Sequence, residues 1–160
     1  MKMKKRANQA SWLVYLIFFS LVCPLAWAQD AGPGDYVGSE ACQQCHEAEY
    51  ESFSRYARKS HSFQSVQKMK KGLTQDEVKV CYACHTTGYG RQSGFVSLEQ
   101  TPELKDAGCE VCHGPGGRHS ETEDPDHIVV KLTIDICKKC HTEERVSAFR
   151  YRPLIHGGAH

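Results

Sequence analysis

The residues with the clearest chemistry are cysteines and histidines that recur as one pentapeptide, Cys-x-x-Cys-His. Four copies occur, at residues 42–46, 81–85, 109–113 and 137–141. Two cysteines three positions apart lie on one side of a single helical turn, so both sulfurs reach the two vinyl groups of one porphyrin. The histidine that follows directly then points its imidazole at the iron. The repeat therefore predicts four covalently attached c-type haems.

This chemistry assigns a role to every cysteine and histidine of the repeat. The cysteines predicted to form thioether bonds are Cys42, Cys45, Cys81, Cys84, Cys109, Cys112, Cys137 and Cys140. The histidines predicted to be proximal iron ligands are His46, His85, His113 and His141. Electron transfer between haems requires no catalytic residue, and none is predicted.

Paired cysteines also build zinc sites, dithiol redox centres and structural disulfides. None of these three requires a histidine directly after every second cysteine. Histidine makes up 9 of the 160 residues, so four such placements have a chance probability of roughly one in 100,000. The haem interpretation is therefore preferred, with zinc as the main alternative.

Residues 1–28 have the organisation of a secretory signal peptide. A basic segment at residues 2–6 precedes an apolar run from Trp12 to Val22, and Ala26-Trp27-Ala28 offers small residues for cleavage. The run is shorter than the ~20 residues of a spanning helix, so no stable membrane span is expected after cleavage; an uncleaved anchor is the alternative. We expect a periplasmic protein, with an extracellular location as the alternative, whose residues 29–160 form one tetrahaem domain.

Charge and composition restrict the partners and the fold. The leader contains four of the 20 basic residues and none of the 19 acidic ones, which leaves 16 − 19 = −3 for residues 29–160. No basic face for nucleic acid is expected from this balance. Few large aliphatic residues remain to build a core, so porphyrins must supply apolar surface. We expect a compact, mainly α fold with extensive loops, whose core is formed largely by four haems and whose apoprotein is largely unfolded.

One helix is predicted at residues 47–63. Tyr50, Phe53, Ala57 and His61 fall at helical spacing, and His61 lies about 20° from Tyr50 around the helix axis. This histidine is therefore expected on the apolar face, where a haem would pack, and is a candidate distal ligand.

Shorter elements are predicted near the other motifs. Residues 74–77 match a capping box that begins a helix leading to the second motif. Thr101-Pro102 predicts a short turn before the third motif, and Gly114-Pro-Gly-Gly117 predicts a tight turn that lets backbone pass close to a haem face. The β-branched and aliphatic residues 128–134 predict one short strand.

The distal side of each iron needs a second ligand. Only Met69 remains once Met1 and Met3 leave with the leader, so histidine–histidine ligation is expected. The histidines outside the pentapeptides are His61, His119, His127, His156 and His160. Because four irons need at most four of them, the residues allow four six-coordinate haems, or three with one iron open to a small molecule.

Several segments next to the motifs are more distinctive than the motifs themselves. They are Tyr36-Val-Gly38 before the first motif, Thr86-Thr-Gly88-Tyr89 and Gly94-Phe95 after the second, Gly108, Glu110 and Gly114-Pro-Gly116 in and around the third, and Phe149, Tyr151 and Pro153 after the fourth. Over most of residues 36–156 the chain resembles the cytochrome c-554 family of tetrahaem proteins.

The resemblance implies a mostly helical protein with haems packed in close pairs along an electron path. By position, His61, His119 and His156 correspond to the family's distal ligands, and His127 and His160 are further possible distal ligands. The haem of the second motif corresponds to one that lacks a distal protein ligand in the type member, which implies small-ligand chemistry there, with nitric oxide suspected. The type member accepts electrons from hydroxylamine oxidoreductase, but the same haem segments occur in proteins with other partners.

Three functions follow as hypotheses. The first is an exported electron carrier that passes electrons between redox partner proteins by haem-to-haem hopping, with donor and acceptor unspecified. The second is a redox enzyme that acts on nitric oxide or hydroxylamine at a five-coordinate haem. The third is a homo-oligomeric, extracellular cytochrome filament, in which a spare histidine such as His160 ligates iron in the next copy.

Overall fold

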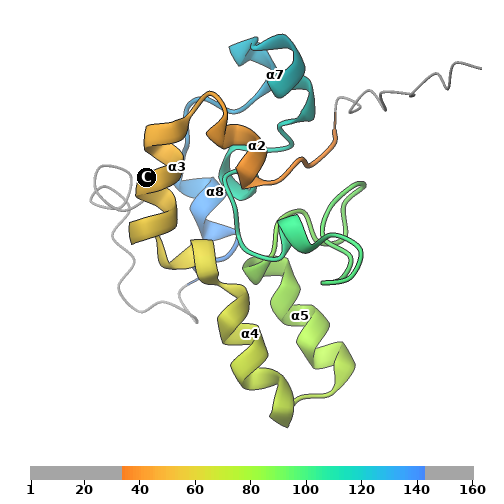
Figure 1. Cartoon of the computed structure of the whole chain (residues 1–160). Coiled ribbons are helices and arrows are strands. Elements are labelled where there is room, and N and C mark those ends of the chain that lie inside the picture. The colour runs from red at the N-terminus through yellow and green to blue at the C-terminus, as the bar shows by residue number, and fades with distance from the viewer. Residues whose placement is uncertain (1–33, 143–160) are drawn as a thin grey trace, which may run out of the picture. The chain divides into compact units, whose positions relative to one another are not determined.

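The computed structural model describes residues 34–142, in which short helices are joined by turns and loops (Figure 1). The helices, with η marking 3₁₀ turns, are α2 Ser39–Gln43, α3 Glu47–Tyr56, η1 Arg58–His61, α4 Phe63–Met69, η2 Lys70–Gly72, α5 Gln75–His85, η3 Pro102–Leu104, α6 Glu110–His113, α7 Gly117–Thr122, η4 Pro125–His127 and α8 Ile134–Lys138. The mainly α class is therefore confirmed. The predicted leader, His156 and His160 lie outside the described residues.

The strand predicted at residues 128–134 is wrong. Residues 34–142 contain no strand, and α8 already begins at Ile134. Val129 instead donates its N–H to the carbonyl of His113 (3.0 Å), which ties this segment to the third motif. An apolar β-branched run forms a strand only where a neighbouring strand pairs with it, and here a helical turn occupies that place.

The long helix predicted at residues 47–63 is interrupted. Helix α3 ends at Tyr56, and Ala57 has an extended conformation (φ −83°, ψ 113°) before η1 begins. The hydroxyl of Ser60 donates to the carbonyl of Ala57 (2.7 Å), and a serine bonded to nearby backbone competes with regular helix. His61 therefore lies in η1 with an exposed side chain, and its expected place on the apolar face of α3 is wrong.

The capping box at residues 74–77 is confirmed. The Thr74 hydroxyl accepts from the N–H of Glu77 (3.4 Å), and the Glu77 carboxylate accepts from the N–H of Thr74 (2.8 Å). Helix α5 runs from this cap through the whole second motif. The turn expected at Thr101-Pro102 is also present, since η3 begins at Pro102.

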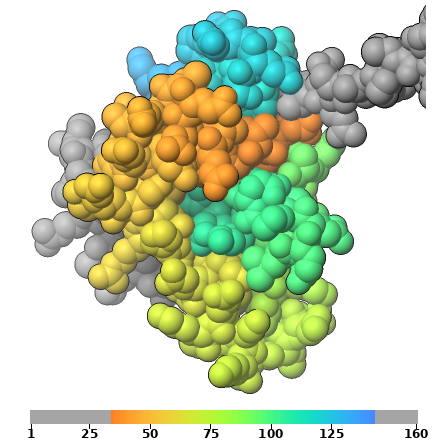
Figure 2. All heavy atoms as spheres, viewed as in Figure 1, coloured from red at the N-terminus to blue at the C-terminus, as the bar shows by residue number. Residues whose placement is uncertain are grey.

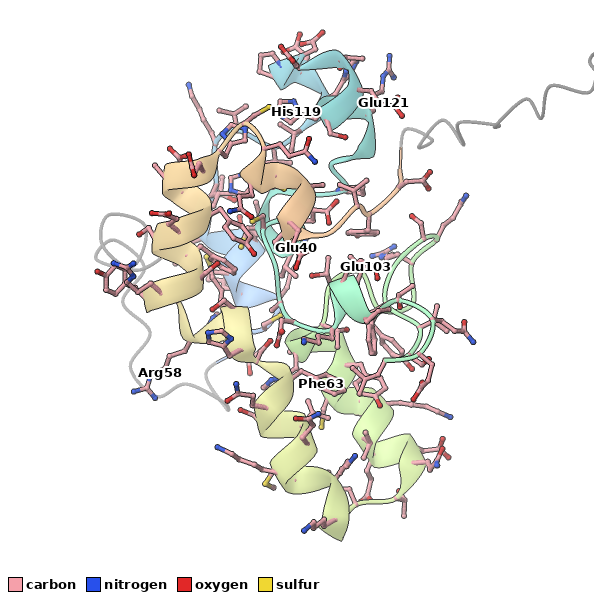
Figure 3. All side chains as sticks on the ribbon, viewed as in Figure 1. Glu40, Arg58, Phe63, Glu103, His119 and Glu121 are labelled. Carbon is pink, nitrogen blue, oxygen red and sulfur yellow. The ribbon has the colours of Figure 1, made fainter. Side chains whose placement is uncertain are left out.

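The apolar core of the described residues is small. Its central cluster is Phe63, Val66, Phe95 and Leu104, between α4, α5 and the loop that follows α5. Figure 3 shows Phe63 between α4 and α5. Large apolar side chains that remain exposed are Tyr56, Met69, Val80, Val96, Val129 and Val130. A chain with so little buried apolar surface depends on other stabilising groups, as its composition predicted.

Buried polar groups hold the loops together. The Glu110 carboxylate is 2% exposed and accepts from three backbone N–H groups, those of Val37 (3.0 Å), Gly38 (2.8 Å) and Gly116 (2.7 Å). Gly114 takes φ +82°, a left-handed conformation suited to glycine, and so turns the chain back toward this carboxylate. One side chain thus fastens the segment before the first motif to the third motif.

Candidate haem-binding sites

Each of the four pentapeptides folds as one helical turn. In the first, third and fourth motifs the histidine N–H donates to the carbonyl of the first cysteine, at 2.9, 3.1 and 2.9 Å. The second motif lies wholly inside α5. Residues at positions i, i+3 and i+4 of such a turn lie on one side, which is the arrangement that thioether attachment and proximal ligation require.

The competing cysteine chemistries lack support from the described residues. None of the eight pentapeptide cysteines forms a disulfide within residues 34–142. Within residues 34–142, no group of three or more cysteine, histidine, aspartate or glutamate side chains is assembled as a metal site. The described cysteines are therefore not gathered into a four-thiolate zinc site.

The imidazoles of the second and third motifs are oriented for metal binding. His85 Nδ1 lies 3.0 Å from the carbonyl oxygen of Ser62, and His113 Nδ1 lies 2.7 Å from that of Val129. Because a carbonyl can only accept, Nδ1 carries the proton in both rings. The lone pair is then on Nε2, which is the usual state of a metal-ligating histidine.

A second histidine lies close to the histidine of the first motif. The rings of His46 and His119 have centroids 6.2 Å apart and planes inclined by 25°. Figure 3 shows His119 on the side of α7 that faces the connection between α2 and α3. His119 Nδ1 lies 3.0 Å from the carbonyl oxygen of Asp124, so its Nε2 also carries the lone pair.

This separation fits an iron between the two rings. Two imidazoles that ligate one iron from opposite sides each place Nε2 about 2.0 Å from the metal, and each ring centre lies about 1.2 Å further out. The ring centres are then about 6.4 Å apart, close to the 6.2 Å between His46 and His119. The first motif and α7 therefore bring together two imidazoles that would be available to one haem iron.

The remaining distal candidates differ in their surroundings. The hydroxyl of Thr122 donates to the carbonyl of Arg118 (2.8 Å), so it accepts from His127 Nδ1 at 2.8 Å. His127 therefore has an available Nε2 like that of His119. His61 is exposed in η1, where its neighbour Ser62 contacts the second motif.

The first and third motifs meet at their first cysteines. A hydrogen bond between the two sulfurs raises the pKa of Cys42 and lowers the pKa of Cys109 to about 6. The Cys42 thiol donates to the carbonyl of Gly38 (3.8 Å), and Cys109 also interacts with the Ser39 hydroxyl. Haems attached to these two motifs would be bonded to neighbouring sulfurs.

Lys59 connects the third and fourth motifs and was not predicted as a site residue. Its Nζ lies 4.0 Å from the sulfur of Cys112 and 5.8 Å from the ring centre of Phe53. Burial, and then the charge of Lys59, lower the pKa of His141. Since Ser62 contacts the second motif, the η1 segment links three of the four motifs. A lone lysine after Arg58 carries no sequence signal for this role.

A groove beside the third motif has room for a large cofactor. It has a volume of about 580 Å³, and its lining includes Tyr36, Val111, Cys112, Arg91 and Lys139. Cofactor pockets commonly measure about 300–1,000 Å³. The two cations supply charges that would hold the carboxylates of a porphyrin.

Comparison with known proteins places this arrangement in a class. Residues 41–114 match the family described as "Cytochrome c554 and c-prime". A multiheme cytochrome MtrC of Shewanella baltica is 29% identical over an alignment of 96 positions, which covers 47% of this chain and 15% of that protein. Together with the mainly helical fold, these matches define a multihaem c-type cytochrome, an electron-transfer protein that carries c-type haem.

A further comparison gives the family. Cytochrome c-554 of Nitrosomonas europaea is 33% identical over an alignment of 160 positions, which covers 87% of this chain and 66% of that protein. The chain belongs to the cytochrome c-554 family. It spans slightly less than two thirds of that relative's length. No solved structure gives a significant match.

Proposed function

We propose that this protein is an exported tetrahaem cytochrome that carries electrons between redox partners by hopping among four c-type haems. The observation that carries the proposal is that all four pentapeptides fold into the same turn. The cofactor supplies a one-electron iron centre at each motif. The chain's own work is to attach, ligate and space these centres and to limit the access of water.

The proposed iron ligands begin with the histidine pair for which the structure gives a ring separation. We assign His46 and His119 to one iron because their rings stand at the separation that bis-histidine ligation requires. His61 and His156 are assigned as distal ligands of other haems, with His127 and His160 as alternatives. Histidine on both sides favours lower reduction potentials than methionine on one side.

Export and location belong to the same proposal. Residues 34–142 contain no helix that is both long and apolar enough to span a bilayer. The leader of residues 1–28 and the attachment of haem outside the cytoplasm support a periplasmic location. Hopping is supported by the contact between the first and third motifs and by the position of Lys59 between the third and fourth.

Mass spectrometry and haem quantitation of the exported protein test the proposal. The expected mature mass is that of residues 29–160 plus four covalent haems, with low-spin ferric spectra. Carbon monoxide titration of the reduced protein then counts open irons. A chain with fewer covalent haems would refute the tetrahaem assignment, and one that turns over nitric oxide or hydroxylamine at an open iron would be an enzyme. A polymer visible by microscopy would indicate the filament.

A further inference from the structure

The segment from the end of α3 through η2, which includes α4, carries several positive charges and no acidic residue. Between Glu51 and Asp76 the chain has no acidic residue. Its cations in this stretch are Arg55, Arg58, Lys59, Lys68, Lys70 and Lys71. In residues 34–142, salt bridges join Lys79 to Asp76 and Lys138 to Asp135, and neither includes a member of this set. The charge of this segment is therefore available to a partner.

Helix α4 presents this charge to solvent. Phe63 and Val66 face the core, whereas Lys68 and Lys71, with two glutamines, line a shallow hollow on the outward side of the helix. Lys70 in η2 is exposed as well. Figure 2 shows the yellow-green surface of the α4–α5 hairpin, which no other segment covers on the face in view.

Exposed apolar side chains accompany the lysines. Met69, at the end of α4, is 63% exposed, and Val80 on α5 is 62% exposed. Val80 directly precedes Cys81 of the second motif and lies one turn before Cys84. Small interfaces of transient electron-transfer complexes combine limited apolar contact with complementary charge, which speeds encounter more than it tightens binding.

Besides Asp76 and Glu77 at the start of α5, a cluster of acidic residues lies at a distance from the lysines of the hairpin. Glu121, Glu123, Asp124 and Asp126 cluster at α7 and η4, and Figure 1 shows α7 and the tip of the α4–α5 hairpin at opposite ends of the view. Such a separation orients the molecule in the field of a charged partner. An acidic partner is repelled from α7 and drawn to the hairpin.

We propose that the hairpin surface formed by Lys68, Met69, Lys70, Lys71 and Val80 docks an acidic redox protein that exchanges electrons with the haem of the second motif. This inference rests on the proposed function, because the exchange needs a haem at Cys81 and Cys84. A redox protein is favoured over a lipid surface because the patch lies on the same hairpin as an attachment site. One electron passes from the donor to the ferric haem, with no bond made or broken.

Stopped-flow reduction of the ferric holoprotein tests the docking surface. The probe is a reduced plant-type [2Fe–2S] ferredoxin, which is an acidic one-electron donor. The test variant carries Lys70→Glu and Lys71→Glu. The matched control carries Lys105→Glu and Lys131→Glu, which are exposed elsewhere and change the net charge equally. At about 0.01 M salt the test variant should be reduced roughly tenfold more slowly than wild type, and the difference should largely vanish at about 0.5 M.

The outcomes separate the two proposals. Dithionite, a small reductant, reduces haem without a docking surface. If every variant is reduced by dithionite but the two lysine pairs slow ferredoxin equally, the docking site is refuted and the carrier function stands. If the test pair abolishes binding to phosphatidylglycerol vesicles and leaves the ferredoxin rate unchanged, the surface binds membrane and the docking proposal is again refuted. A wild-type chain without haem overturns both.

Discussion

Replacement of Glu110 by glutamine should strongly destabilise the holoprotein. Oε1 of Glu110 accepts from Val37 and Gly116, and Oε2 accepts from Gly38, inside a site where the side chain is 2% exposed. A glutamine oxygen can keep the pair of bonds at Oε1, but its NH₂ group then faces the N–H of Gly38. One charge-assisted bond is lost and a buried donor is left unpaired, which costs about 2–4 kcal/mol in total.

Alanine at this position should cost more. It would leave all three buried N–H groups without a partner, at about 1–3 kcal/mol each, which approaches the whole stability of a typical domain. Glu110→Gln is therefore the better test, because its smaller cost leaves a folded protein whose stability can be measured. Glu51→Gln on the exposed side of α3 is the matched control and should cost less than about 0.5 kcal/mol.

Guanidinium unfolding of the mature holoprotein, followed by haem absorbance and circular dichroism, measures these differences. Covalent attachment keeps the haems on the unfolded chain, so unfolding is not confounded by cofactor loss. Equal midpoints for the Glu110→Gln and Glu51→Gln variants would refute the claim that this carboxylate fastens the segment before the first motif to the third motif.

Three further predictions concern the ligands, the charge near the haems and pH. His119→Ala should convert one haem to a high-spin, carbon-monoxide-binding form by absorption and electron paramagnetic resonance spectroscopy, whereas His127→Ala should not. Lys59→Met should lower the potential of a haem in redox titration, because removal of a cation near the third and fourth motifs favours the oxidised iron; Lys59→Arg should not. The hydrogen bonds with Thr74 lower the pKa of Glu77 in the folded protein. The ionised carboxylate therefore stabilises the fold fully above the unfolded-state pKa of 4.5, and this stabilisation is lost as the pH falls through the folded-state pKa. Thr74→Ala should therefore lower stability more at pH 7 than at pH 3 in thermal unfolding.

Each of these predictions has a result that contradicts it. If all haems of the His119→Ala protein remain low-spin, His119 is not a ligand of the haem attached to the first motif. Unchanged potentials in Lys59→Met would mean that solvent screens the lysine completely. A loss of stability in Thr74→Ala that is the same at both pH values would show that the cap acts without the Glu77 charge.

Sequence periodicity predicted the local structure well where neighbours along the chain decide it. The Thr74–Glu77 capping box and the turn at Pro102 depend on bonds between residues close in sequence, and both are present. The helix predicted at residues 47–63 is interrupted at Ala57. The hydroxyl of Ser60 bonds to the carbonyl of Ala57, and the Asp106 carboxylate accepts from the N–H of Phe63, where α4 begins. The spacing of apolar residues does not reveal where side-chain hydrogen bonds to the backbone replace those of a regular helix.

By itself, the sequence determined the c-type cytochrome class of this protein, since each pentapeptide places two cysteines and a histidine within a single turn. It also gave the class of fold, because short helices are what such turns and their caps favour. Only the tertiary structure brought His119 to His46, placed Lys59 between two motifs and buried Glu110 against three backbone donors. These contacts join residues far apart in the chain, and their formation depends on how loops pack, which no periodic pattern encodes.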